Sequence, residues 1–171
     1  MKTLLILCAI LLLSGCAAYD GRGLQPGVAS LADIERVMGP PALRWPEAAG
    51  GEKLAYPRGP VGVHTYMVWV DPAGRLVASE NVLQTKYFAR IQPGMTHEEV
   101  LRLIGPPYGP WTTYFEARDE LVWEWRWCDD WSEPARFNVF FDGKTGRVRS
   151  TGNLTESQRF AMPRGRIWCS H

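Results

Sequence analysis

Four cysteines and three histidines are the side chains in this sequence best suited to nucleophilic, acid–base or metal chemistry. They form no recognisable motif, because Gly-x-Ser-x-Gly, His-Glu-x-x-His and phosphate-loop patterns are all absent from the sequence. His97 falls near the start of an expected helix, where it should be solvated, and His171 is the last residue. Negative charge at Asp129 and Asp130 disfavours a thiolate at Cys128. We therefore expect no enzyme activity, metal or other cofactor.

The first sixteen residues favour a different cysteine chemistry. Lys2 precedes an apolar run over 4–13, which is too short to span a bilayer but has the length of an export signal's apolar region. The run ends in Leu-Ser-Gly-Cys, which resembles the lipobox of bacterial lipoproteins. That resemblance implies cleavage before Cys16, a diacylglycerol anchor on its thiol and, because Ala17 follows, delivery to the outer membrane. The alternative is an ordinary cleaved signal with an incidental cysteine. We expect a signal over 1–15 and a lipidated tether over 16–24.

Two cysteines remain unmodified in this scheme, since Cys8 leaves with the signal and Cys16 carries lipid. In an oxidising periplasm Cys128 and Cys169 should form a disulfide that holds the C-terminal tail, 153–171. The formal net charge of the whole chain is only +1, and removal of Lys2 abolishes that excess. Such a balance indicates no polyanionic partner, so we expect no nucleic acid, and no motif indicates a small-molecule substrate.

Aromatic side chains gather between positions 111 and 131. Trp123, Trp125 and Trp127 alternate along one expected strand and so share a face. One interpretation is that they pack under a helix as core, because Trp is highly buried on average. The other is a platform for a protein partner, since one short helix cannot easily cover three indoles unless the other half of the chain also packs there. On the second interpretation the partner-binding residues are Trp111, Tyr114, Trp123, Trp125, Trp127 and Trp131.

The elements that must position these residues occur twice, because the segment 25–41 returns as 92–107. Ser30 and Thr96 are expected N-caps, each with an acid three residues later, as a capping box requires. Apolar residues then recur at i, i+3 and i+4, the spacing of one helix face. Gly39 and Gly105, each followed by proline, end the pattern. The sequence thus predicts two short helices within 30–39 and 96–105.

Strand signals follow each predicted helix. The segments 65–70 and 136–141 each run into a tight turn and a second strand, and earlier strands are expected at 53–56 and 121–127. Gly74, Gly143 and Gly146 are expected to supply positive φ values in the turns. The predicted fold class is α+β: two tandem repeats, 25–86 and 87–152, each a two-layer unit with a short helix packed on an antiparallel sheet of at least three strands.

The second repeat carries a family resemblance. Its order Pro-Gly-Met-Thr-x-x-Glu-Val-x-x-x-Ile-Gly-Pro-Pro, a Trp-rich strand, and Phe-x-Val-x-Phe-Asp-x-x-x-Gly-x-Val resembles the small-protein-A/outer-membrane-lipoprotein-A family. The match is good over 91–148. It holds only in outline over 25–77, where Leu31 replaces the histidine and the middle strand carries Pro57 and Gly59. Two such units in tandem are similar in plan to the β-lactamase inhibitor proteins, which bind through a concave sheet.

The resemblance implies an outer-membrane lipoprotein that acts as a protein-binding scaffold or accessory factor of the cell envelope, in outer-membrane protein assembly. Its partners would be envelope proteins and, through the lipid anchor, the membrane. The alternative is a periplasmic binding or inhibitor module that grips one protein through an aromatic sheet face.

Overall fold

The computed structural model describes residues 20–161 and residue 169 of the 171-residue chain. The expected signal and the expected lipid attachment site, Cys16, lie outside the described residues. Among the residues that are described, no helix combines the length and the apolar character needed to cross a membrane.

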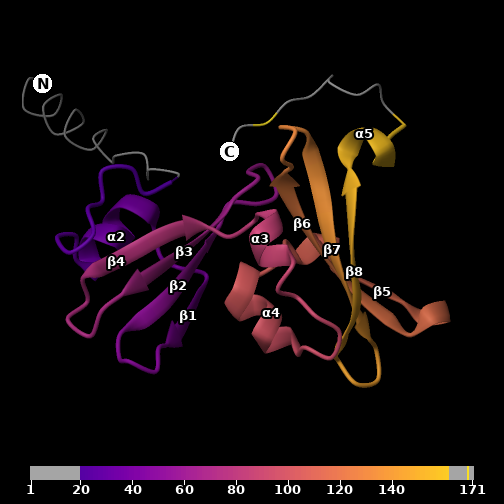
Figure 1. Cartoon of the computed structure of the whole chain (residues 1–171), viewed down its shortest axis with the longest axis horizontal. Coiled ribbons are helices and arrows are strands. Elements are labelled where there is room, and N and C mark those ends of the chain that lie inside the picture. The colour runs from indigo at the N-terminus through magenta and orange to yellow at the C-terminus, as the bar shows by residue number, and fades with distance from the viewer. Residues whose placement is uncertain (1–19, 162–168, 170–171) are drawn as a thin grey trace, which may run out of the picture.

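Two similar series of elements follow one another along the chain (Figure 1). The first contains α2 (Leu31–Met38), β1 (Leu43–Pro46), β2 (Glu52–Pro57), β3 (Thr65–Val70) and β4 (Leu76–Asn81). After α3 (Thr85–Phe88), the second contains α4 (His97–Ile104), η2 (Gly109–Trp111), β5 (Thr113–Phe115), η3 (Glu116–Arg118), β6 (Glu120–Cys128), β7 (Pro134–Asp142), β8 (Val148–Thr155) and α5 (Glu156–Arg159). Each series forms a four-stranded antiparallel sheet with its strands in sequence order. The predicted α+β class with two tandem helix–sheet units is confirmed, and each sheet gains a short first strand, β1 or β5, that the sequence signals did not indicate.

The helices α2 and α4 begin and end at the residues that their caps predict. Ser30 Oγ accepts the Asp33 N–H and Thr96 Oγ1 accepts the Glu99 N–H, each at 3.2 Å. The two carboxylates accept the N-cap N–H groups in return, which completes both capping boxes. Each helix ends at a glycine with a positive φ. Local sequence therefore sets both helices before any tertiary contact is considered.

The segment before each helix is tied to the last strand of its own sheet in the same way. In the first repeat Arg75 Nη1 donates to the Val28 carbonyl at 2.7 Å, and Ser30 forms an antiparallel bridge with Arg75. In the second, Arg147 Nη1 donates to the Gly94 carbonyl at 2.8 Å, and Thr96 bridges to Arg147. The shared contacts show that the two halves are structural repeats as well as sequence repeats.

The hairpin turn at Gly143 differs from its prediction. Gly74 and Gly146 have φ values of +72° and +64°, as expected, but Gly143 does not lie in the positive-φ region. A Cβ atom on Gly143 would instead lie 2.2 Å from Asp119 Oδ1 and 2.7 Å from Tyr114 Oη. Close approach of the β5–β6 connection, and not backbone conformation, therefore explains the glycine at this position.

The first sheet is covered on both faces. One face packs on α2, and this core cluster includes Ile34 and Met38 of the helix with Leu54, Tyr56 and Val68 of the strands. All five side chains are at most 2 % exposed. The other face of the same strands, which carries Ala55 and Met67, belongs to a second and larger core cluster. Such two-sided burial explains why β2 and β3 contain consecutive apolar residues and not a simple alternation.

The helix α4 lies between the two sheets (Figure 1). Its Val100 and Ile104 are fully buried in the larger cluster, which joins residues of both sheets. The end of the helix is so close to the first sheet that a Cβ on Gly105 would lie 2.7 Å from Thr65 Cγ2. Trp45 Nε1 of β1 also donates to Glu98 Oε1 at 2.7 Å. One helix thus serves both repeats, and the order of layers is α2, first sheet, α4, second sheet.

Candidate functional site

The three alternating indoles of β6 face α4. Trp125 and Trp127 are each 3 % exposed, and Trp123 is half-buried. Phe88 of α3 covers Trp127, with ring centroids 4.8 Å apart, and stacks on Phe137 at 3.8 Å. Trp127 Nε1 donates to Asn153 Oδ1 at 2.9 Å, so its polar atom is satisfied within the sheet. Trp125 and Trp127 are therefore packed as core, and we leave them out of the candidate surface.

The cover over the indoles comes from more than one helix. α4 and α3 both contribute, and the first sheet backs α4 with Ala55 and Met67 in the same cluster. The sequence interpretation allowed that the other half of the chain could also pack over the Trp face. The structure shows this arrangement. An apolar face that is already covered by α3, α4 and the first sheet of the same chain offers little area to a partner.

His97 is not solvated, in contrast to the sequence expectation. Its ring stacks on Trp123 at 4.7 Å between centroids and contacts the ring of Phe141 at 4.3 Å. Burial lowers the pKa of His97 below its ordinary value. The position is the first residue of α4, where the partial positive charge of the helix N-terminus also disfavours a protonated ring. His97 therefore acts as a neutral, half-buried part of the aromatic core.

Acidification should destabilise the wild-type protein through His97. The unfolded chain takes up a proton near the ordinary histidine pKa, whereas the folded chain does so only at lower pH. The contribution of neutral His97 to stability is therefore fully present above the ordinary histidine pKa. It is lost as the pH falls through the lowered pKa of the folded state. Thermal unfolding followed across this range should show a smaller acid loss for His97→Phe than for wild type. An equal loss in both proteins would assign the effect to other groups.

The opposite, outer face of the second sheet is partly open. It presents the residues of β6 and β7 that alternate with the buried indoles, among them Val122, Glu124 and Asn138. A depression of about 410 Å³ lies on this face. Its lining combines aromatic, charged and amide groups: Pro110, Trp111, Thr113, Phe115, Arg118, Val122, Glu124, Asn138, Phe140 and Arg159. We call these residues the outer-face depression. Sequence reasoning did not assign Phe115, Phe140 and the charged residues of this face to the site. Only Glu124 had a usable signal, because it alternates with the indoles along β6.

A network of ion pairs lies next to the outer-face depression and shares Glu124 and Arg159 with it. Arg136 Nη1 binds Glu124 Oε1 at 2.9 Å, and Arg136 Nε and Arg126 Nε bind Glu156 Oε1 at 2.9 and 2.8 Å. Arg159 binds the second oxygen of Glu124 at 2.5 Å. Burial acts to raise the pKa of Glu156, but hydrogen bonds and charges from Arg126 and Arg136 outweigh it and hold that pKa below its ordinary value. Glu156 is thus kept ionised, and the network fixes the arginine side chains in place.

Trp111 and Tyr114 lie at different sides of this sheet. Trp111 is half-buried, and its ring stacks on the Arg136 guanidinium at 3.8 Å, so it is part of the outer face. Tyr114 is 50 % exposed, and its hydroxyl donates to the Asp119 carboxylate. It alternates with Thr113 and Phe115 along β5, so it points to the side opposite the outer-face depression. Of the two, only Trp111 contributes to one surface with Phe115 and Phe140.

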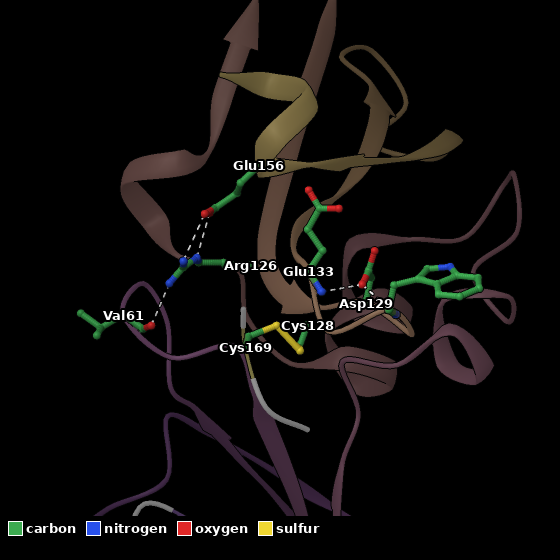
Figure 2. The surroundings of a disulfide bond; sticks show 8 residues. Val61, Arg126, Cys128, Asp129, Glu133, Glu156 and Cys169 are labelled. Carbon is green, nitrogen blue, oxygen red and sulfur yellow. Dashed lines mark hydrogen bonds and ion pairs between the residues drawn. A yellow bond between two sulfur atoms is a disulfide. The ribbon is translucent and has the colours of Figure 1, made fainter. Parts of the chain in front are cut away.

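The turn between β6 and β7 presents Trp131, which is 83 % exposed. Asp129, itself 8 % exposed, accepts the N–H groups of Trp131 and Glu133 at 2.9 and 2.8 Å. Cys128 is bonded to Cys169, with Sγ atoms 2.07 Å and Cα atoms 5.8 Å apart (Figure 2). The Cys169 N–H also donates to the Ser132 carbonyl at 3.0 Å. We call residues 128–133 the braced turn, because a carboxylate and a disulfide hold it while its indole stays in water.

Arg126 of β6, two residues before the braced turn, connects the two repeats. Arg126 reaches from the outer face to the Val61 carbonyl at 3.0 Å, while its other nitrogens bind Glu156 (Figure 2). The loop before β3 is therefore attached to the network that supports the outer face.

These surfaces present mainly charged and aromatic side chains. Within residues 20–161 and 169, no group of three or more His, Cys, Asp or Glu side chains is placed to hold a metal ion. Arginine and aromatic side chains such as these are enriched at protein interfaces. Comparison with protein-family models, with curated proteins and with solved structures found no match to this chain.

Proposed function

We propose that this chain is a lipid-anchored outer-membrane protein that binds an envelope protein through the braced turn and the outer-face depression, as a scaffold or accessory factor in outer-membrane protein assembly. The observation that carries the binding proposal is Trp131, an 83 % exposed indole on a turn held by Asp129 and a disulfide. An anchor that is rigid before binding loses little conformational entropy on association.

The location is proposed from sequence and is consistent with the cysteine chemistry. The lipobox-like Leu-Ser-Gly-Cys supports lipidation at Cys16, and the Cys128–Cys169 bond is typical of an oxidising compartment such as the periplasm. The role in outer-membrane protein assembly is supported by the family resemblance of residues 91–148.

Photo-crosslinking in cells tests the binding surface. A photoreactive phenylalanine analogue at position 131 should give a discrete adduct, and the same analogue at Val77, an exposed apolar residue on β4, should not. Trp131→Ala should weaken capture of the purified adduct partner by about 2 kcal/mol, as for other hot-spot indoles. Barrel-assembly proteins in the adduct support the scaffold role, whereas one soluble periplasmic protein supports an inhibitor role. No adduct at position 131, or equal adducts at both positions, contradicts the proposed surface.

Cys16→Ala should abolish membrane attachment. Among the described residues no helix is long and apolar enough to cross a bilayer, and stable attachment through lipid needs acyl chains bound to the protein. Cells labelled with radioactive palmitate should show no label on the variant, which should leave the outer-membrane fraction. Cys8→Ala is the matched control, since Cys8 precedes the expected cleavage site and its loss should leave the label unchanged. Palmitate on the Cys16→Ala protein would contradict the lipoprotein proposal.

A further inference from the structure

The free edge of β8 carries backbone groups that have no partner among the described residues. β8 is the last strand of its sheet. Its Thr155 N–H donates away from β7, to Gln158 Oε1 at 3.0 Å. Backbone groups alternate in direction along a strand of an antiparallel sheet, so Thr151 and Asn153 present N–H and C=O groups to this same edge. No described residue forms a backbone hydrogen bond with them there.

The chain itself already pairs with the first part of this edge. The Val148 N–H donates to the Met95 carbonyl and the Gly94 N–H donates to the Val148 carbonyl, both at 2.8 Å. The direction is antiparallel, as the bridge between Thr96 and Arg147 shows. This internal pairing ends at Val148, so the edge is competent for strand addition but is used over only its first residues.

A groove of about 340 Å³ lies beside this edge from Val148 to Thr151, where the internal pairing ends. One side is formed by β8 and the other by the end of α3 and the segment that follows it. The lining residues are Phe88, Ala89, Ile91, Gln92, Pro93, Val148, Arg149, Ser150 and Thr151. Phe88 and Ile91, which belong to the large core cluster, supply apolar side chains to a lining that also contains polar residues. β8 also lacks the lysine and proline residues that commonly protect sheet edges.

We propose that this groove binds one extended peptide segment of a partner protein, which continues the internal pairing as an antiparallel strand on Thr151 and Asn153 and sets an apolar side chain against Phe88 and Ile91. A single strand is the occupant because the groove is bounded on both sides. Main-chain bonds supply affinity in this mode, and the apolar side chains of the groove supply side-chain preference. The site lies on the edge of the sheet and is separate from the outer-face depression and the braced turn.

A short capped peptide of alternating threonine and valine, with a fluorescent label, is a suitable probe for the full-length protein in detergent. Binding measured by anisotropy should be lost when the peptide backbone is N-methylated, because the side chains remain but the donors are gone. Amide hydrogen exchange of Thr151 and Asn153 should slow on binding, whereas Gly152, which alternates with them and faces β7, should be unaffected.

Two variants test whether the peptide probe binds at this edge and in this groove. Thr151→Pro removes an edge donor without removing a bond to β7, and Ala89→Phe fills the groove from an exposed position. Each should weaken binding about tenfold, the loss expected when a peptide acceptor is left unpaired or excluded. Ser79→Pro, the corresponding edge position of β4, is the matched control and should bind normally.

Three results would overturn the proposal. The first is equal binding by the N-methylated peptide, or no binding by either peptide. The second is equal weakening by Ser79→Pro, which would mean that any sheet edge suffices. The third is a dimer in sedimentation experiments whose Thr151 and Asn153 amides are protected without peptide, since a second copy of the chain would then occupy the edge.

Discussion

Replacement of Trp125 by alanine is expected to lower the free energy of unfolding by about 3 to 5 kcal/mol, the range for truncation of a buried Trp. The indole is 3 % exposed and lies in the cluster that joins both sheets and α4. Its ring lies 6.1 Å from that of Trp123 and 6.4 Å from that of Phe137, between centroids. Removal would leave a cavity that the surrounding sheets can fill only in part.

Denaturant unfolding of three variants tests this expectation. Trp125→Phe should lose less than Trp125→Ala, because it keeps an aromatic ring and the indole N–H has no hydrogen-bond partner among the described residues. Trp131→Ala should change stability by no more than about 0.5 kcal/mol, as exposed substitutions do. If Trp125→Ala unfolds at the same denaturant concentration as Trp131→Ala, the packing of β6 against α4 described above is wrong.

Removal of the Cys128–Cys169 disulfide is expected to cost about 4 kcal/mol on the chain-entropy model. The two residues are 41 positions apart, so the bond restricts a long loop in the unfolded chain. In the folded state it holds Cys169 to the braced turn, where the Cys169 N–H also donates to Ser132. Its loss should therefore reduce stability and also loosen the turn that presents Trp131.

The double variant Cys128→Ser, Cys169→Ser should unfold at lower denaturant than wild type, and reductant should shift the wild-type curve toward that of the variant. Reductant should have no effect on the variant itself, which serves as the control. Thiol titration of unfolded protein, prepared without reductant, checks the premise. Two free thiols from Cys128 and Cys169 would show that the bond does not form.

Comparison of the sequence expectations with the structure separates local from long-range information. The helices α2 and α4 were predictable because caps such as Ser30 with Asp33, the apolar spacing and the terminal glycines act within one short segment. The β3–β4 and β7–β8 hairpins were predictable for the same reason, through tight turns such as Asp71-Pro72-Ala73-Gly74. β1 and β5 were not, since four and three residues are too few to show a periodic pattern.

The positions of the aromatic residues could be determined only by the tertiary structure. Alternation placed Trp123, Trp125 and Trp127 on one face, but whether that face meets water depends on α4 and on a sheet formed by residues 43–81. His97 became half-buried for the same reason, through rings contributed by β6 and β7. By itself the sequence determined the repeated elements and the candidate cysteine chemistry. Packing between the repeats decided which aromatic residues form the core and left Trp131 exposed.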